Sequence, residues 1–482
     1  MIALDISLLV IAAVLGYAWV GYPWILALAS QRASRRDRSS PGEDAADERP
    51  TVAVLLSAYN EESHIEARLL NLLGMEYPAD KLFILVGCDG ATDGTVVAAS
   101  RIAREHPRVR VLGFPINRGK MAVLKDLVEV AGGPRPAAGE RRMGLAQARA
   151  AGNERPGSEG GPNNADIAFT PPLAACRLPQ VPDILVFTDA NTLFAPDALA
   201  KLLRHFADPV VGGVCGRLVL ESRVTTDHGP RTTDHDSVRS SSEFSVPAPS
   251  AEGMYWRWES RMKEWESVVD SCLGANGAIY AIRRELFWDD IPANTVVDDF
   301  VVGMKVRERG HRMLYEPAAL AMEELPKTAD EWTRRVRIGA GDFQALWLCR
   351  RCLMPRYGRF AWMFWSHKVL RWFTPHVLLA LGGMAAYLQW TTGHGPLNLD
   401  CHSHTSILPY APTLVLLGLA VLLALAALGR LIRMSGMSAP RLLCLCDHFV
   451  TMQAAVFAGF LRFCRGGLKG AWARTPRGSA GR

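Results

Sequence analysis

An uncharged apolar run near the amino terminus constrains this chain more than any other feature. Residues 6 to 30, ISLLVIAAVLGYAWVGYPWILALAS, contain no charged side chain over 25 positions. A helix needs about 20 such residues to cross the hydrocarbon core of a bilayer. The run is too long for the core of a secretory signal, and its basic cluster follows it at Arg32, Arg35, Arg36 and Arg38. We therefore expect an uncleaved transmembrane anchor over residues 1–33.

The carboxyl-terminal part of the chain has further apolar runs. We expect a membrane region over residues 374–465, with spans at about 374–391 and 408–429. A third run, 442–463, is interrupted by Asp447 and His448 and has basic residues on both sides. A full crossing would leave the basic tail, residues 466–482, outside, against the usual bias of Lys and Arg. We favour a re-entrant or interfacial segment for 442–463, and a crossing is the alternative.

The same charge bias sets the expected orientation. The basic cluster after the first run places the amino terminus outside and residues 31 to about 373 in the cytoplasm. The sequence thus predicts a multi-pass protein of the cell membrane. Basic membrane flanks account for the net charge of +6, so no nucleic-acid partner is expected. Residues 351–373 mix aromatic and basic side chains, which is typical of a helix in the headgroup zone; a buried soluble helix is the alternative.

Between a charged linker, residues 34–50, and residue 350, strand and helix patterns alternate. Strands are predicted in TVAVLLSAY, KLFILVGCD, RVRVLGF and DILVFTD. Helices are predicted over residues 61–73, 95–105 and 120–130. This order indicates an α/β fold with a parallel sheet covered by helices on both faces. Such sheets bind ligands beyond the carboxyl ends of their strands.

Two segments interrupt the alternation. Residues 132–180 and 222–250 are rich in polar residues, Gly and Pro, and lack hydrophobic periodicity. Neither segment could bury enough apolar surface to offset the entropy lost on ordering. We expect both to be surface insertions in a domain that spans residues 51–350.

Polar residues gather where the predicted strands end. The four ends read SAYNEE, GCDGATDG, NRGK and TDAN, so acids, amides and a lysine should meet at one edge of the sheet. Each has a simpler explanation when taken alone. Asn60 and Asp93 could cap the helices that follow them. Lys120 at a helix amino end is mildly disfavoured unless an anion is near, which favours a phosphate partner.

These motifs, in this order and spacing, resemble the nucleotide-sugar half of the inverting family 2 glycosyltransferases. The later sequences GANGAIYAIRREL, VVDDF and RRVRIGAGDFQAL resemble the acceptor half. The likeness covers about residues 51–350 apart from the two insertions. It is strongest to the membrane-embedded synthases of cellulose, hyaluronan and poly-N-acetylglucosamine. The resemblance implies a cytoplasmic domain of GT-A fold, a Rossmann-like nucleotide-diphospho-sugar transferase, joined to transmembrane helices.

The resemblance also implies roles for the donor side. Tyr59 and Glu61 would line the nucleoside pocket, Asp89 would hold the base, usually uracil, and Lys120 would lie near the diphosphate. Asp189 and Asn191 occupy the place of the family's D-x-D motif, which binds Mg²⁺ or Mn²⁺. Asn191 replaces the second acid, and because an amide carries no charge we expect weaker metal binding.

On the acceptor side, the resemblance assigns Asp299 as the base that takes the proton of the acceptor hydroxyl, with Asp298 beside it. Taken alone, this acidic pair could simply cap a helix from Phe300 to Glu308. Gly274, which opens the GANG sequence, belongs to the substrate-binding residues by the same likeness. Arg334, Arg337 and Ile338 stand where polysaccharide synthases have Q-x-x-R-W. Arg337 keeps a cation for the diphosphate, but the missing Trp puts processive polymerisation in doubt.

The sequence therefore predicts an inverting membrane glycosyltransferase that uses a UDP-sugar in the synthesis of an extracellular polysaccharide. One alternative is transfer of a single sugar to a polyprenyl-phosphate or other lipid-linked acceptor. Another is a catalytically silent nucleotide-sugar-binding subunit of a membrane assembly. Expected partners are the nucleotide sugar, a glycan or lipid-linked acceptor and membrane lipid, with homo-oligomers or export subunits possible. The tail sequence WARTPRG is similar to a loop that closes over the nucleotide in cellulose synthases, and a plain basic tail is the alternative.

Overall fold

The computed structural model describes residues 2–36, 49–132, 177–221, 251–324, 331–392 and 410–466. Most of both predicted insertions, at 133–176 and 222–250, lies outside the described residues. The same holds for most of the linker (37–48) and for the tail from residue 467, including WARTPRG.

Four parallel strands form one half of the sheet, in the order β3-β2-β1-β4. They are β1 (Val52–Ala58), β2 (Leu82–Asp89), β3 (Val109–Phe114) and β4 (Ile184–Asp189). The helices between them are α3 (Glu62–Leu73), α4 (Thr95–Glu105) and α5 (Lys120–Val130). The strand and helix patterns of the sequence therefore gave these elements correctly.

Side-chain alternation along β1 divides the interior into two cores. Val52, Val54 and Leu56 point into a core shared with α3, α4 and the short helix α7 (Ala198–Leu203). Ala53 and Leu55 point into the opposite core, shared with α5. Successive strand residues face opposite sides of a sheet, so a fully apolar strand requires helices on both faces. The all-buried pattern of β1 meets this requirement.

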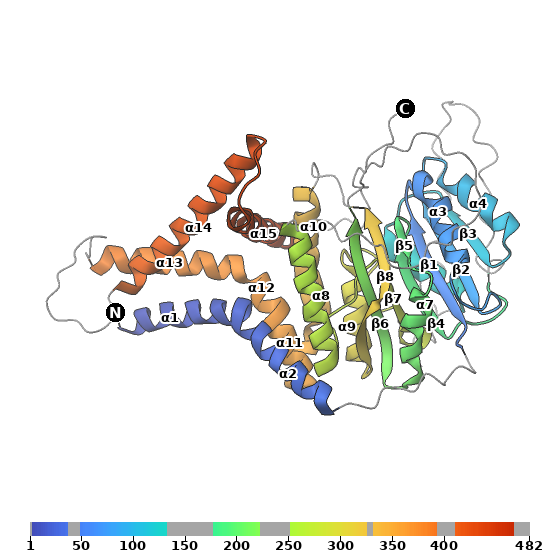
Figure 1. Cartoon of the computed structure of the whole chain (residues 1–482), viewed down its shortest axis with the longest axis horizontal. Helices are drawn as coiled ribbons and strands as arrows, with labels where there is room; N and C mark the ends of the chain where they lie inside the picture. Colours follow the sequence, from blue (N-terminus) through green and yellow to red (C-terminus); the bar gives the residue numbers. More distant parts are fainter. Residues whose placement is uncertain are drawn as a thin grey trace, which may run out of the picture.

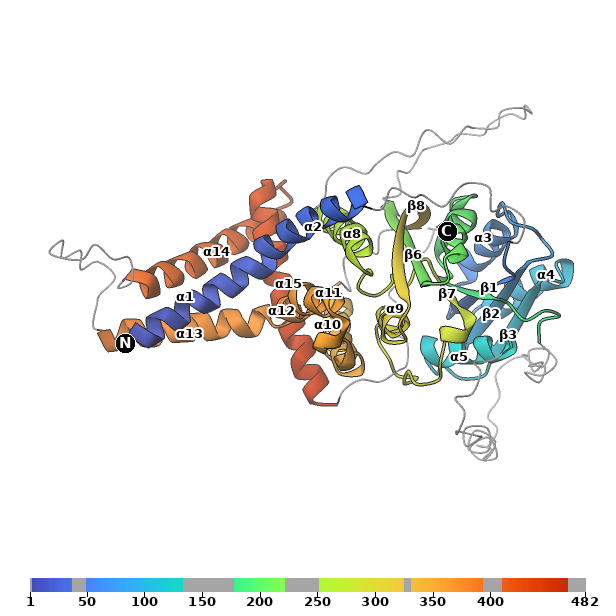
Figure 2. The ribbon, with the colours of Figure 1, turned by 90° about the horizontal axis from the view of Figure 1, so that it is seen from below.

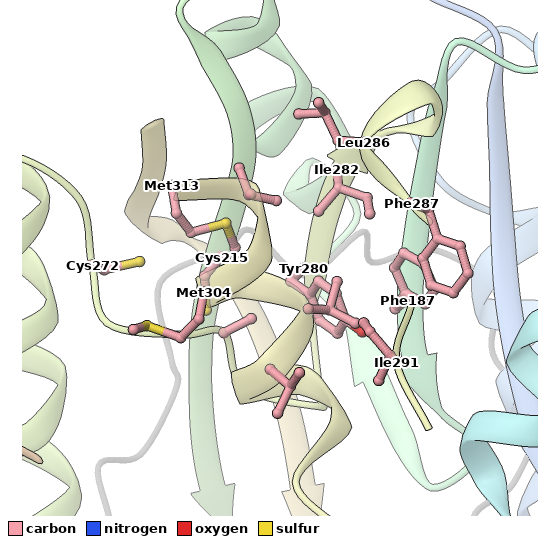
Figure 3. Close-up of a cluster of buried hydrophobic side chains, with 14 of the residues drawn as sticks. Phe187, Cys215, Cys272, Tyr280, Ile282, Leu286, Phe287, Ile291, Met304 and Met313 are labelled. Carbon is pink, nitrogen blue, oxygen red and sulfur yellow. The ribbon is translucent and has the colours of Figure 1, made fainter. Parts of the chain in front are cut away.

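The other half of the sheet is mixed. Its strands are β7 (Tyr280–Arg283), β6 (Val211–Glu221), β8 (Arg312–Glu324) and β5 (Thr192–Phe194), and they continue the order from β4. β7 is antiparallel to both β4 and β6, whereas β6 and β8 are parallel. The helix α9 (Asp298–Glu308) covers this half, and its Met304 belongs to the same buried cluster as Tyr280 and Phe187 (Figure 3). Phe187 and Tyr280 stack with ring centroids 4.7 Å apart.

Two long helices, α8 (Ala251–Val269) and α10 (Glu331–Leu348), stand between the sheet and a group of apolar helices (Figure 1). The apolar group contains α1 (Ile2–Gly16), a π-helical turn η1 (Tyr17–Gly21) and α2 (Tyr22–Arg36). It also contains α13 (Thr374–Thr392), α14 (Ala411–Met434) and α15 (Arg441–Cys464). Figure 2 shows α1 and α13 running side by side away from the sheet.

Three described helices are long and apolar enough to cross a membrane: 6–34, 411–434 and 441–464. A fourth candidate is the pair 359–372 and 374–391, which bends by 61°. This bent pair begins with α11 (Arg359–Met363), a second π-helical segment η8 (Phe364–Val369) and α12 (Leu370–Trp372). Phe360 and Phe364 are buried in the same core as α9, so the predicted interfacial segment packs directly on the α/β domain.

Helix α15 crosses α10 in backbone contact. A Cβ atom added at Gly459 would lie 2.6 Å from the main-chain N of Ala340 and the C of Gly339. In Figures 1 and 2, α15 lies steeply across the common direction of α1 and α13. Because α15 is also long and apolar enough to cross a membrane, its placement as an interfacial or a spanning segment stays a prediction.

Candidate active site

The carboxyl ends of β1, β2 and β4 meet at one edge of the sheet. Ser57 of β1 lies beside Gly87 of β2 and beside Asp189 of β4. Parallel pairing brings the polar segments that follow these strands to the same edge. The convergence expected from the sequence motifs is therefore present for these strand ends.

Lys120 and Asp189 form an ion pair at this edge. The first turn of α5 supplies Lys120, and its Nζ lies 2.7 Å from Oδ1 of Asp189. The same Nζ is 3.8 Å from Oδ2 of Asp298, in the first turn of α9. One ammonium group thus lies between acids from both halves of the sheet.

Gly277, in the loop before β7, marks the point on which these groups converge. A Cβ atom at Gly277 would lie 3.3 Å from Nζ of Lys120 and 3.4 Å from Oδ2 of both Asp189 and Asp299. Oδ2 of Asp189 and Oδ2 of Asp299 are therefore separated by at most twice 3.4 Å. Because residue 277 is glycine, no side chain of its own separates these three charged groups.

Burial and mutual charge shift the pKa values of the cluster. Burial raises the pKa of Asp298 to about 6; Lys120 opposes this shift, and the negative charges of Asp299 and Asp189 add to it. Burial also raises the pKa of Asp299, although Lys120 opposes it. For Lys120, burial lowers the pKa, but attraction by the three acids outweighs burial and raises it above its ordinary value. Three carboxylates facing one ammonium leave an excess of negative charge.

Asp89, at the end of β2, holds the loop that leads to Lys120. The carboxylate is fully buried, and it accepts hydrogen bonds from the backbone N–H groups of Arg118 (2.9 Å) and Gly119 (2.8 Å). Gly119 has a φ of +94°, in the region that favours glycine. The NRGK sequence is thus anchored by an acid from the neighbouring strand. Contact of Asp89 with a nucleobase stays a prediction.

Tyr59 and Glu61 follow β1 at the same edge. Tyr59 is half-buried, and Oε2 of Glu61 lies 3.0 Å from Nδ1 of His64. Nearby, Asn60 accepts a hydrogen bond of 2.8 Å from the backbone N–H of Thr92, in the loop after β2. The Asn60 side chain therefore links two strand-end loops instead of capping α3, for which no side-chain cap bond is present.

The Asn191 side chain is held by a hydrogen bond to a neighbouring strand. Its Nδ2 donates to Oε1 of Glu323, on β8, at 2.8 Å. Sequence reasoning missed Glu323, because only the pairing of β5 with β8 brings it to the site. No described group of three or more His, Cys, Asp or Glu residues is arranged to hold a metal ion.

A divalent cation nevertheless suits the charge of this edge. Oδ2 of Asp298 is buried without a hydrogen-bond partner in the described structure, and Oδ2 of Asp189 would lie 3.4 Å from a Cβ atom at Gly277. Mg²⁺ is often held by one or two carboxylates together with phosphate oxygens and water. Asp189 alone meets the protein's share of that requirement.

Gly274 ties the loop before β7 to α9. Its φ is +72°, and a Cβ atom there would lie 2.4 Å from Cδ2 of Phe300. Gly303 is equally confined, since its Cβ would lie 2.7 Å from the backbone N of Ala275. These glycines allow the loop to press against the helix that begins with the acidic pair.

Arg337 and Arg334 both lie on α10. Arg337 makes no hydrogen bond or ion pair with another described residue, whereas Arg334 pairs with Glu331 at 3.4 Å. Burial and the like charges of Arg334 and Arg462 lower the pKa of Arg337, while Asp298 opposes this change. Arg337 thus lies near enough to Asp298 and to Arg462 of α15 for their charges to shift its pKa.

A buried arginine next to the end of β4 was not predicted from the sequence. Arg68, on α3, is fully buried and donates to Oγ1 of Thr188 at 2.7 Å. Burial lowers its pKa to about 9, with the charge of Asp189 opposing the shift. Its position in the apolar stripe of α3, between Ile65 and Leu69, was the available signal.

The geometry is that of a GT-A nucleotide-sugar transferase fold. The mannosyltransferase PcManGT from Pyrobaculum calidifontis, solved in complex with GDP-Man and Mn²⁺, matches it with a TM-score of 0.56. The alignment covers 96% of this chain and 98% of that one at 21% identity, so the likeness concerns the fold. A model described as "Glycosyltransferase like family 2" matches residues 50–337, and the chain belongs to this family.

Curated relatives are poly-beta-1,6-N-acetyl-D-glucosamine synthases. The protein from Staphylococcus aureus is 22% identical over 306 residues, which are 62% of this chain and 56% of that protein. The protein from Staphylococcus epidermidis is 20% identical over 302 residues, 61% of this chain and 55% of its own length. The matched part thus spans about half the length of these relatives.

Proposed function

We propose that this chain is a membrane-bound inverting glycosyltransferase that transfers a sugar from a UDP-sugar to a growing glycan in extracellular polysaccharide synthesis. The observation that carries the proposal is the convergence of Lys120, Asp189 and Asp299 around Gly277. Similarity to poly-beta-1,6-N-acetyl-D-glucosamine synthases supports the polymer class. The apolar helices support a membrane location, and the basic cluster after the first apolar run favours a cytoplasmic α/β domain.

Inversion requires one base and no protein nucleophile. Asp299 accepts the proton of the acceptor hydroxyl as its oxygen forms a bond to the anomeric carbon. The bond from that carbon to the diphosphate breaks, and its electron pair leaves on the phosphate oxygen. Burial raises the pKa of Asp299 and so makes it a better proton acceptor than an exposed carboxylate. Asp298 shares the charge of Lys120 and holds that cation beside the base.

Cationic side chains would stabilise the departing diphosphate. Lys120 is already held at the site by Asp189, and Arg337 has a planar guanidinium without a described partner. Asp189, aided by Asn191, would hold Mg²⁺ or Mn²⁺, and such an ion neutralises charge on phosphate oxygens. Tyr59, Glu61 and Asp89 lie at the same sheet edge and would form the nucleoside side of the pocket, with Gly274 and Arg334 on the acceptor side.

A lipid-linked acceptor is the second candidate, because of a cavity among the apolar helices. The cavity measures about 350 Å³ and lies between α10, α14 and α15. Its lining is largely apolar, with Trp332 from α10 and with Arg430 and Asp447 at its polar part. An isoprenoid chain with an anionic head group matches this combination. The position of Ile338 where the polysaccharide synthases have Trp agrees with such an acceptor.

The test uses the full chain purified in detergent, with UDP-GlcNAc, UDP-glucose and GDP-mannose as donors and Mg²⁺ or Mn²⁺ present. Transfer is measured with a glycan and with a polyprenyl phosphate as acceptors, and donor binding is measured separately. We expect Asp299→Asn to lower turnover by at least about 1,000-fold while donor affinity changes little. Asp197→Asn, which changes an exposed acid paired with Lys201, is the control.

Donor binding without turnover in the wild-type protein would contradict the proposal and select a silent binding subunit. Turnover with polyprenyl phosphate but not with glycan would select the lipid-linked acceptor. Product analysis of the active pairing then gives the sugar and the linkage.

A further inference from the structure

Helix α8 carries a stripe of buried charged residues that the transfer chemistry does not use. Glu259, Lys263 and Glu266 are all less than 9% exposed and lie on one face of the helix. A buried charge is costly unless it is paired and hydrogen-bonded. The partners of this stripe therefore show what the helix holds in place.

On one side, the stripe holds the loop between α8 and β7. Oε2 of Glu266 accepts a hydrogen bond of 3.1 Å from the backbone N–H of Leu273. Nζ of Lys263 donates to the carbonyl oxygens of Leu273 (3.3 Å) and Gly274 (3.1 Å). Glu266 and Lys263 thus hold the N–H and carbonyl groups of Leu273 and the carbonyl group of Gly274.

This loop in turn fixes the start of α9. The backbone N–H of Ala275 donates to the carbonyl oxygen of Asp299 at 3.4 Å, and Gly274 presses against Phe300. Phe300 N–H also donates to Oδ1 of Asp299 at 2.8 Å, which orients the carboxylate. A connected path of contacts therefore runs from Glu266 to the carboxylate that faces Gly277.

On its other side, the stripe contacts the apolar helices. Oε1 of Glu266 accepts a hydrogen bond of 3.1 Å from the Tyr22 hydroxyl, at the start of α2. The same oxygen lies 2.5 Å from Nδ1 of His367, in the π-helical segment η8. Nε2 of His367 lies 3.2 Å from Glu259, which also pairs with Lys368. Tyr22 and His367 are both buried, so water does not compete with these bonds.

We propose that Glu266 is a positioning residue for glycosyl transfer. It connects Tyr22 and His367 to residues 273–275, so the arrangement of Tyr22 and His367 sets the position of Asp299. The inference rests on the proposed function in so far as Asp299 is the base. A displacement of about 1 Å between reacting groups can cost about 100-fold in rate, so small movements of α2 or η8 would change turnover. Donor binding would be spared, because the nucleoside side of the pocket is assigned to Tyr59, Glu61 and Asp89, which lie outside this path of contacts.

The experiment compares the full-length wild-type protein with Glu266→Gln and Tyr22→Phe in detergent. Glutamine cannot accept hydrogen bonds at both ends of its amide, so either Leu273 or the pair Tyr22 and His367 loses its acceptor. Tyr22→Phe removes one hydrogen bond and keeps the ring in the core. Glu264→Gln is the matched control, because Glu264 lies on the same helix and pairs only with the exposed Arg261 in the described structure.

Two readouts separate this inference from the proposed function. Amide hydrogen exchange at residues 273–275 and in the first turn of α9 needs no turnover, and we expect it to rise at least about 10-fold in both test variants. Turnover per donor-binding site should fall about 10- to 100-fold in Glu266→Gln and less in Tyr22→Phe, with the donor Kd within about threefold. The Glu264→Gln protein should match the wild type in both.

Unchanged exchange at residues 273–275 in both test variants would overturn the positioning role, whether or not the wild type transfers a sugar. If Glu266→Gln fails to fold, the Tyr22→Phe protein decides by the same two readouts. Increased exchange with unchanged turnover per donor-binding site would also overturn it, since the contacts would then serve stability alone. Absence of transfer by the wild type with every donor would instead count against the proposed function.

Discussion

Lys120 and Asp189 form an ion pair with 2.7 Å between Nζ and Oδ1, although 69 positions separate them in the chain. The pair joins the first turn of α5 to the end of β4. Asp298 extends it from the other half of the sheet. Lys120 therefore holds both halves of the candidate site together before any substrate arrives, and the predictions below follow from this arrangement.

Gly277→Ala should block the site without changing its charge. The new methyl group would lie 3.3–3.4 Å from Lys120, Asp189 and Asp299, where a reactant is expected. Because Gly277 does not have a positive φ, the substitution introduces no backbone strain. We expect kcat/KM to fall about 10- to 100-fold and the melting temperature to change by less than about 2 °C. Gly383→Ala, with nothing near its added Cβ, is the control; wild-type turnover in Gly277→Ala would place the reaction elsewhere.

Asn191→Asp should strengthen metal binding. It restores a second acid two residues after Asp189, and charged ligands hold hard cations more tightly than amides. The change also removes the hydrogen bond to Glu323 and sets two acids opposite each other. We expect the Mn²⁺ concentration for half-maximal binding in the presence of UDP to fall about 3- to 10-fold, measured by electron paramagnetic resonance. The melting temperature without metal should decrease; unaltered Mn²⁺ binding would show that Asn191 does not face the ion.

The acidic pair should give both turnover and stability a dependence on pH. The pKa of Asp298 is raised to about 6 and that of Asp299 is also raised. In the unfolded chain an aspartate titrates near pH 3.9. The folded state therefore binds protons more readily between these values, and the free energy of unfolding decreases as pH rises through about 4 to 6.

Turnover follows the opposite trend, because the base must be ionised. We expect kcat/KM to decline as the pH falls toward the raised pKa of Asp299, while the melting temperature rises relative to that of Asp298→Asn. Rates and melting curves between pH 5 and 8 check both trends. A flat rate profile down to pH 5 would mean that this pair does not supply the base.

Gly459→Ala tests the crossing of α10 and α15. Its Cβ would lie 2.6 Å from main-chain atoms of Gly339 and Ala340, which cannot move aside like a flexible side chain. We expect the free energy of unfolding to fall by about 1–3 kcal/mol, with a lower rate because Arg337 lies on α10 two residues before this contact. Gly418→Ala, in α14 with nothing near its added Cβ, should be neutral or slightly stabilising. Equal melting temperatures for the two variants would show that the helices do not touch there.

The sequence by itself determined the parallel half of the domain and the classes of residue at its edge. Apolar runs such as Val52–Leu56 need cover on both faces, and local propensity sets the bounds of α4 and α5, which match the predicted ranges. Strand ends in a parallel sheet must share an edge, so Asp89, Lys120 and Asp189 could be assigned to one site from their spacing.

Only the tertiary structure decided the mixed half of the sheet and the supports of the acidic pair. Glu323 reaches Asn191 because β5 pairs with β8, and Glu266 reaches Leu273, Tyr22 and His367 because α8 lies between the sheet and the apolar helices. No local pattern encodes such contacts. Antiparallel pairing of distant segments and the pairing of buried charges depend on how the elements of the whole chain pack together. Hydrophobic periodicity fixes which face of an element is buried, whereas the partner of each buried polar group is fixed by the three-dimensional packing.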